Sequence, residues 1–374
     1  MIVFERVLRA KRAWILRSKR VKPEALRDSL GRAKKAKRLI NANFMKHNYD
    51  FIAIGDITTD AFIRIKDASV TCDINREHCM LCMRFGDKIP YEEVFIVRAV
   101  GNSPNAAVSA SRLGLKSAIV TNLGGDEAGR EAIDKLTSEH VGTEFVSVHK
   151  NQKTNYHYVL WYEEERTILI KHEEYDYELP DIDEPRWVYL SSMAENSLAF
   201  HNKIQKYLDS HPDIKFAFQP GTYQMKFGKE KLAYFYKRAD VFVCNKEEYQ
   251  RILGTEESDI KKLMSMMRDL GPNIVVLSDG IKGAYSYDGN EYLFMRYYPD
   301  PKPPFERTGA GDAFTSTVVS ALALGHDIRT ALMWGPINSM SVVQHVGAQA
   351  GLLTRPELEA WLSKAPEDYV PKVI

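Results

Sequence analysis

One short stretch indicates both the fold and the chemistry of this chain: Thr308-Gly309-Ala310-Gly311-Asp312, at the start of an apolar run that continues to Leu324. Two glycines around one small residue at the start of a helix allow backbone N–H groups to converge on an anion, and the helix dipole adds a favourable field. An aspartate beside such an anion suits a general base that accepts a hydroxyl proton while a phosphate is attacked. The alternative interpretation is a glycine-rich helix start that Asp312 only caps.

Upstream of this stretch, short apolar strands alternate with helices. We expect strands at 51–55, 117–122, 187–190, 214–218, 241–243 and 274–277, and helices at 105–113, 127–138, 198–209, 228–237, 246–253 and 258–269. This alternation predicts crossover connections, and therefore a mostly parallel sheet covered by helices on both faces. The first helix is expected to have Ser103 as its N-cap and Pro104 at its first helical position.

Two segments interrupt this pattern. Residues 60–99 and 152–172 contain runs in which alternate positions are apolar, such as Thr154-Asn155-Tyr156-His157-Tyr158-Val159-Leu160. Such runs predict an exposed antiparallel sheet separate from the main one.

Composition places the chain among globular proteins. Of its 374 residues, 44% are hydrophobic and 27% charged, which fits one large α/β domain with an appendage. No apolar run approaches the roughly 20 residues that span a bilayer, and no signal-peptide pattern follows Met1. Four cysteines in this length do not make a disulfide framework, so a reducing cytoplasm is expected.

The net charge of +1 hides an asymmetry. Residues 1–48 carry 15 Lys or Arg against three acidic residues, a net charge of +12, which leaves −11 on the remainder. We therefore expect a basic extension at residues 1–44 and the folded domain at 45–374. The extension is either an upstream translated segment or solvated basic helix, or a tail that binds RNA or anionic lipid.

Further motifs appear in a fixed order along the chain. Gly101-Asn102-Ser103-Pro104-Asn105-Ala106-Ala107 leads to Arg112-Leu113-Gly114, and Gly124-Gly125-Asp126-Glu127-Ala128-Gly129 follows. Together with the stretch at 308–312, they resemble the signatures of the ribokinase-like (PfkB-type) carbohydrate kinase family over roughly residues 49–365. The resemblance implies a three-layer α/β/α sandwich with a small β-sheet lid from about 58–99 and 152–175.

The resemblance also implies roles for individual residues. Gly309, Ala310 and Gly311 would form an anion hole, and Asp312 would be the catalytic base. Asp60 would bind substrate hydroxyls together with Gly101, Asn102 and Asn105.

ATP would lie beside Asn245, Asp279, Gly280, Gly283 and Asn338, with Gly347-Ala348-Gln349 near the adenine. Glu248 of the Asn245-Lys246-Glu247-Glu248 motif would hold Mg²⁺ through water, because Mg²⁺ tends to retain bound water.

Some positions depart from the family pattern or admit a second interpretation. Glu306 stands where sugar kinases of this family usually have Asp, next to Arg307, so dependence on K⁺ is left open. Arg166 could reach the transferred phosphate from the lid, although a surface arginine is the alternative that we favour. Cys72, His78, Cys79 and Cys82 invite a zinc interpretation, against which we expect thiols packed in the lid.

The sequence therefore predicts an ATP- and Mg²⁺-dependent kinase that phosphorylates a primary alcohol of a sugar. A ribonucleoside kinase of the adenosine type is the alternative, because lid aromatics (Phe85, Tyr156, Tyr158 and Trp161) could stack on a base. A catalytically weak regulatory or RNA-associated protein is a more remote alternative. We expect a monomer or a lid-mediated homodimer, no membrane partner, and nucleic-acid binding only through the basic extension.

Overall fold

The computed structural model describes residues 48–72, 79–163 and 165–374. Contacts divide the chain into two units, residues 1–48 and 49–374, and the second is described here. The basic extension expected at 1–44 lies outside the described residues, as does His78 of the zinc hypothesis. Within the described residues, no helix has the length and apolar character that crossing a bilayer requires.

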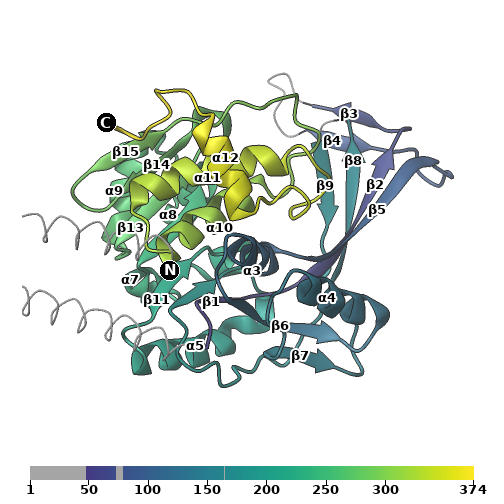
Figure 1. Cartoon of the computed structure of the whole chain (residues 1–374). Coiled ribbons are helices and arrows are strands. Elements are labelled where there is room, and N and C mark those ends of the chain that lie inside the picture. The colour runs from purple at the N-terminus through teal and green to yellow at the C-terminus, as the bar shows by residue number, and fades with distance from the viewer. Residues whose placement is uncertain (1–47, 73–78, 164) are drawn as a thin grey trace, which may run out of the picture. The chain divides into compact units, whose positions relative to one another are not determined.

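A ten-stranded sheet forms the centre of the described part (Figure 1), in the order β16-β15-β14-β13-β12-β11-β10-β1-β6-β7. The parallel strands are β1 (Phe51–Ile54), β6 (Ser117–Gly124), β7 (Val146–His149), β10 (Trp187–Leu190), β11 (Lys215–Phe218), β12 (Val241–Asn245) and β13 (Ile274–Ser278). The antiparallel edge consists of β14 (Ala284–Tyr287), β15 (Tyr292–Met295) and β16 (Lys372–Val373).

Helices cover both faces of this sheet. One face carries α3 (Asn102–Arg112), α4 (Glu127–Ser138), α10 (Ala310–Ala323), α11 (Ile328–Val342) and α12 (Arg355–Ser363). The other carries α5 (Leu198–Ser210), α6 (Thr222–Phe227), α7 (Ala233–Arg238), α8 (Lys246–Leu253) and α9 (Ile260–Asp269). The predicted three-layer α/β sandwich is confirmed.

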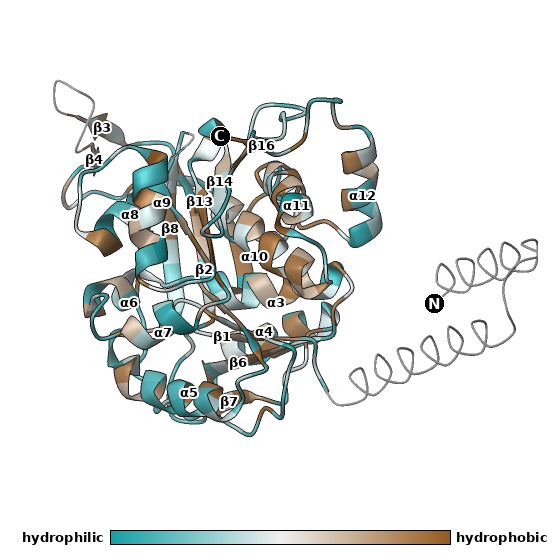
Figure 2. Cartoon of the chain, turned by 90° about the vertical axis from the view of Figure 1, so that its left-hand side faces the viewer, coloured by the Kyte–Doolittle hydropathy of each residue, from teal (hydrophilic) through white to brown (hydrophobic). Residues whose placement is uncertain are grey.

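Strand β1 is apolar at every position because both of its faces are buried. Along β1, Phe51 and Ala53 join the core on one side of the sheet, whereas Ile52 and Ile54 join the core on the other. Burial of each of the larger side chains, Phe51, Ile52 and Ile54, contributes about 1.5–3 kcal/mol. In Figure 2, outer helices such as α5 and α12 show hydrophilic and hydrophobic residues on the same helix, as a single buried face requires.

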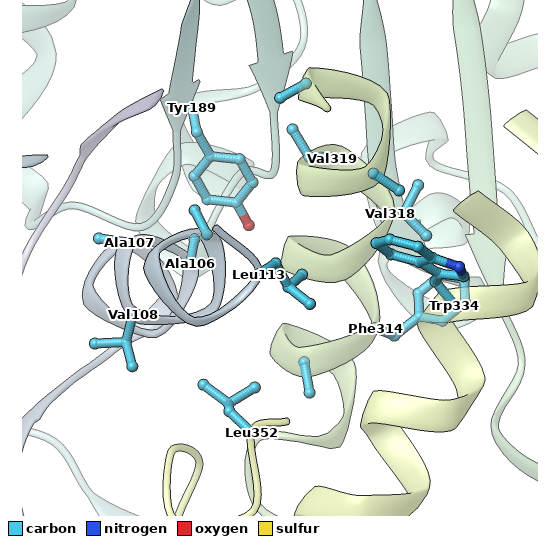
Figure 3. Packing of buried hydrophobic residues seen from close by; sticks show 14 of the residues in the cluster. Ala106, Ala107, Val108, Leu113, Tyr189, Phe314, Val318, Val319, Trp334 and Leu352 are labelled. Atoms are coloured by element: carbon cyan, nitrogen blue, oxygen red, sulfur yellow. The ribbon is translucent and has the colours of Figure 1, made fainter. Parts of the chain in front are cut away.

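Helix α10 differs from these outer helices because it is buried almost all round. Ten of its residues are buried, and it packs against both α3 and α11. Figure 3 shows Leu113, at the end of α3, pointing toward α10, and Tyr189 of β10 reaching into the same cluster. The helix that begins at the Gly309–Asp312 stretch is therefore held on several sides.

The lid is a second, four-stranded sheet in the order β5-β2-β8-β9. Its strands are β2 (Thr58–Ile65), β5 (Tyr91–Val100), β8 (Tyr156–Tyr162) and β9 (Glu165–Leu169). The expectation of a wholly antiparallel sheet is wrong for one pair, since β2 and β8 are parallel while the other pairs are antiparallel. Strands β2 and β8 begin side by side, with Thr59 opposite Tyr156, and both run away from the main sheet.

A short hairpin of β3 (Ser69–Thr71) and β4 (Met80–Cys82) extends from the lid. Its register places Thr71 opposite Met80, so the next pair outward is Cys72 and Cys79, which form a disulfide. The expectation of free thiols at these two positions is therefore wrong. The same bond removes two of the ligands of the zinc hypothesis, and Cys82 and Cys244 are the free cysteines of the described residues.

Two helix boundaries also differ from expectation. Helix α3 begins at Asn102 with Gly101 as its N-cap, so Ser103 lies inside the helix rather than at its cap. The helix expected at 228–237 does not begin at Gly228, which has a φ of 86° and ends α6; α7 begins only at Ala233.

Candidate active site

The candidate site lies at the carboxyl ends of the parallel strands, beside the lid. Open α/β sheets bind ligands at this edge, because the loops that follow the strands converge there. Gln219 follows β11, Asn245 ends β12, and Asp312 lies in the first turn of α10.

Asp312 is surrounded by side-chain amides. Asn102 donates through Nδ2 to Oδ1 at 2.8 Å, and Asn105 donates through Nδ2 to Oδ2 at 2.9 Å. Gln219 contributes a longer contact from Nε2 to Oδ1 at 3.4 Å. The carboxylate therefore accepts from two different segments, α3 and the loop after β11, which fix its orientation.

The charge state of Asp312 is shaped by two opposing effects. The residue is half-exposed to the site, yet protein atoms crowd the carboxylate closely enough that desolvation raises its pKa. Hydrogen bonds from Asn105, Gln219 and Asn102 lower the pKa, while the negative charge of Asp60 raises it. Desolvation dominates, so Asp312 is a more basic carboxylate than one in water, as proton acceptance requires.

The turn that precedes Asp312 leaves room for an anion. Gly309 is the N-cap of α10 and has a φ of 82°, and a Cβ there would lie 2.3 Å from Cβ of Ala348. No atom lies within 4 Å of where a Cβ of Gly311 would stand. Gly309 thus makes the turn, and Gly311 leaves the helix N-terminus open to a ligand. Asp312 does not cap the helix, since it lies inside it.

Asn102 and Asn105 were expected to bind substrate, but both of their amide groups face Asp312. The Oδ1 atom of Asn105 accepts from Nε2 of Gln349 at 3.1 Å, so this buried side chain is engaged by protein on both sides. Gln349, expected near an adenine, also donates to the carbonyl of Ala99. Asn102 and Asn105 thus hold the carboxylate of Asp312, and their role in binding substrate stays a prediction.

Asp60 lies on β2 at the inner side of the lid. Its Oδ1 is 3.5 Å from Nδ1 of His157, the residue opposite it on β8. Oδ1 of Asp60 and Nε2 of His157 are both buried and have no hydrogen-bond partner among the described residues. A buried carboxylate oxygen and a buried imidazole nitrogen without partners suit a ligand whose hydroxyl groups can both donate and accept.

A pocket of about 310 Å³ adjoins the turn Gly309–Gly311, called the anion turn below. It is lined by Asn245, Ser278, Gly280, Ile281, Gly283, Ala284, Tyr297, Tyr298, Asp300, Pro304, Arg307, Ala310, Gly311, Phe314, Pro336, Ser339, Met340 and Val343. Of the residues expected to bind nucleotide, Asn245, Gly280 and Gly283 therefore line it. The pocket reaches Ala310 and Gly311, so a bound molecule could present an anion to the turn.

Two other residues expected at the nucleotide do not line this pocket. Asp279 precedes the turn Gly280–Lys282, and its Oδ2 lies 3.6 Å from Nζ of Lys282. Asn338 is fully buried; its Nδ2 donates to the hydroxyl of Thr317 at 2.7 Å, and its Oδ1 accepts from the backbone N–H of Leu353 at 2.9 Å. Asn338 therefore links α11 to α10 behind the pocket wall.

Glu248 lies at the start of α8 and forms a capping box with Asn245. The backbone N–H of Asn245 donates to Oε2 of Glu248, and the N–H of Glu248 donates to Oδ1 of Asn245. Desolvation raises the pKa of Glu248, and the negative charge of Asp312 raises it further. Two desolvated carboxylates that repel each other suit a bound cation, so the residues present fit Mg²⁺.

Glu306 is buried and meets Arg166 from the lid. Oε1 of Glu306 is 3.7 Å from Nε of Arg166, whose side chain is 27% exposed. Arg166 is therefore a partly exposed arginine of β9, as expected, but it also approaches a buried carboxylate. Arg307 does not make this contact and lines the 310 Å³ pocket instead.

Sequence reasoning did not include Gln219 and His157 in the site. Gln219 carries a detectable signal, because it directly follows an apolar strand at the carboxyl edge of the sheet. His157 has no such signal, since its contact with Asp60 depends on the parallel register of β2 and β8.

Comparisons with known proteins agree with this architecture. The model of the pfkB family carbohydrate kinases matches residues 70–355. An ATP-dependent 6-phosphofructokinase from Thermoanaerobacterium thermosaccharolyticum is 24% identical over 320 residues, which cover 82% of this chain and 91% of the relative.

Solved structures show the same fold. A nucleoside kinase from Methanocaldococcus jannaschii, an archaeal member of the ribokinase family, has a TM-score of 0.68 at 16% identity, covering 84% of this chain and 98% of its own. Ribokinase from Arabidopsis thaliana, complexed with ribose and ATP, has a TM-score of 0.68 at 18% identity, covering 83% and 98%. With the family match spanning most of the folded unit, the chain belongs to the pfkB family of carbohydrate kinases, enzymes that transfer a phosphoryl group to an alcohol.

Proposed function

We propose that this kinase transfers the γ-phosphoryl group of ATP to a hydroxymethyl group of a sugar or sugar derivative. The observation that carries the proposal is the position of Asp312. Its carboxylate is oriented by amides from two segments and has a raised pKa, and it adjoins a helix N-terminus that is open to an anion.

In the proposed reaction Asp312 accepts the proton of the attacking hydroxyl. The backbone N–H groups from Gly309 to Gly311 would stabilise negative charge on the transferred phosphate. ATP would occupy the 310 Å³ pocket, with its phosphates directed toward Ala310 and Gly311. Mg²⁺, held near Glu248 through water, would neutralise phosphate charge.

The substrate would lie between Asp312 and the inner side of the lid. Oδ1 of Asp60 and Nε2 of His157 would form hydrogen bonds with its hydroxyls. The lid would exclude water, which otherwise competes as phosphoryl acceptor.

A sugar suits this site better than a nucleoside. Along β8, Tyr156 and Tyr158 point to the face opposite His157, where they line a hollow of about 910 Å³ with Thr59 and Ile96. Phe85 is fully exposed. Tyr156 and Tyr158 are therefore directed away from Asp60, whereas Trp161 shares the face of His157 but is buried against Phe305.

We also propose that K⁺ is not required. A monovalent cation near the anion turn would balance the charge of Glu306, and Arg166 already approaches that carboxylate. The guanidinium is always charged, so it provides this balance at any working pH.

One experiment tests these proposals together. ATP consumption by purified protein is measured with ribose, fructose, fructose phosphates, keto-deoxy sugar acids, adenosine and cytidine, in K⁺ and in tetramethylammonium. We expect turnover with a sugar, equal rates in both salts, and a loss of about 10²–10⁴-fold in Asp312→Asn, the range of general base catalysis. Turnover with adenosine alone would contradict the substrate proposal, a several-fold gain in K⁺ would contradict the cation proposal, and an active Asp312→Asn would contradict the base.

A further inference from the structure

The lid contacts the segment before the anion turn through two neighbouring side chains. Trp161 of β8 and Arg166 of β9 stand opposite each other in the lid sheet. The ring of Trp161 packs edge-on against Phe305, with ring centroids 5.4 Å apart. Nε of Arg166 lies 3.7 Å from Oε1 of Glu306. A cross-strand pair of the lid thus contacts two consecutive residues, Phe305 and Glu306, of the segment before the anion turn.

Glu306 in turn holds the first residue of the turn. Its Oε1 accepts hydrogen bonds from the backbone N–H of Thr308, at 2.6 Å, and from the hydroxyl of Thr308. The backbone N–H groups of Phe305 and Glu306 both donate to the carbonyl of Val343, which anchors the segment on α11's C-cap. The orientation of the Glu306 carboxylate therefore sets the path of the chain into Gly309.

The buried carboxylate of Glu306 calls for a positively charged partner. Glu306 is 3% exposed, and its Oε2 is buried without a hydrogen-bond partner in the described part of the chain. A buried carboxylate that is neither paired nor fully hydrogen-bonded is strongly disfavoured. Arg166 forms the ion pair that the described residues offer to Glu306.

We propose that Arg166 is a positioning residue for the phosphoryl transfer: it neutralises and orients Glu306, which fixes Thr308 and so the anion turn beside Asp312. This inference rests on the proposed kinase function. It also links the lid to the anion turn, because Arg166 can approach Glu306 only when β9 lies over Glu306.

Direct contact between Arg166 and the transferred phosphate would produce a similar loss of rate, and a double-mutant cycle separates the two roles. If Arg166 acts through Glu306, removing it matters little once Glu306 has lost its charge. If it binds phosphate, its removal costs the same in both backgrounds.

The experiment compares wild type, Arg166→Ala, Arg166→Lys, Glu306→Gln and the double variant Arg166→Ala/Glu306→Gln. Arg84→Ala is the matched control, because Arg84 is an exposed lid arginine whose partners, Asp67 and Asp87, also lie at the surface. We expect Arg166→Ala to lower kcat by about 100-fold, the scale of a small misplacement of reacting groups, with a smaller change in the KM for ATP. Free guanidinium should restore part of that rate, Arg166→Lys should retain part of it, and the double variant should be no slower than Glu306→Gln.

A second readout does not depend on activity. Hydrogen exchange at the amide of Thr308 should be faster in Arg166→Ala than in wild type or Arg84→Ala, while the melting temperature changes little. Unchanged exchange at Thr308, unchanged kcat, or additive losses in the cycle would overturn the inference. Failure of the proposed function has a different signature: wild type without phosphoryl transfer, or Asp312→Asn with full activity, while the exchange difference at Thr308 persists.

Discussion

The amides around Asp312 act on its proton affinity as well as on its position. Each donates an N–H to the carboxylate, and such hydrogen bonds favour the ionised form. Burial acts in the opposite direction and is the larger effect, so the pKa of Asp312 is raised. Only the ionised form accepts a proton, so kcat/KM should fall as the pH decreases through this raised pKa.

Removing one amide should therefore move the acid limb of the pH–rate profile. In Asn102→Ala the carboxylate loses a donor that lowers its pKa, so the pKa rises further and activity is lost at a higher pH than in wild type. The measurement is kcat/KM across pH, with Asn290→Ala, in an exposed turn, as the control. An acid limb that stays in place or moves to lower pH would contradict this account of the site.

At the scale of elements, the anion turn depends on a backbone conformation that only glycine adopts easily. Gly309 has a φ of 82°, and its Cβ position is 2.3 Å from Cβ of Ala348. Gly325 has a φ of 88°, but no atom lies within 4 Å of its Cβ position. Both glycines, one before α10 and one after it, have the same kind of backbone conformation, but only Gly309 has a neighbour that a side chain would strike. Comparing substitutions at the two positions therefore distinguishes the cost of backbone strain from the cost of steric contact.

Gly309→Ala should lower both stability and activity. The left-handed conformation alone costs a residue with a side chain roughly 1–2 kcal/mol, and the contact with Ala348 adds to this and displaces the turn. Gly325→Ala should show only the backbone cost and keep normal turnover. Thermal unfolding and kcat are measured for both variants, and equal effects in the two would contradict the steric argument.

Sequence patterns predicted the parallel strands except β7, and most of the helices, because those elements are decided by local apolar runs. Helix α4, for example, begins and ends where its pattern does, at Glu127 and Ser138. The hairpin of β14 and β15 was not predicted, although it pairs locally across short turns, because each strand has only four residues and so a weak pattern. The approach of Arg166 to Glu306 was not predictable because it joins residues 140 positions apart.

At the scale of the whole molecule, the chain combines an acidic folded unit with a basic N-terminal segment. Residues 1–48 carry a net charge of +12 and the remainder −11. Because the residues with a proposed catalytic role all lie between Asp60 and Asp312, we expect the basic segment to be dispensable for turnover.

Deleting residues 1–44 should therefore leave kcat and KM unchanged. The same deletion should lower the salt concentration at which the protein elutes from an RNA or heparin column, since phosphate contacts scale with basic charge. A large loss of kcat would show that the segment belongs to the catalytic unit. Unchanged elution would exclude it as a tail that binds polyanions.

The separation of the lid from the main sheet has a consequence for how such an enzyme can diversify. The base and the phosphate-binding turn sit on α10, whose side chains are almost all buried, so changes there disturb the core. Asp60 and His157, proposed to meet the acceptor, come from the lid, a thinner sheet with exposed positions such as Ile96 and Tyr158. Substitutions in the lid strands, in nature or in laboratory libraries, could therefore change which phosphoryl acceptor is bound, while the part that binds the phosphoryl donor stays unchanged.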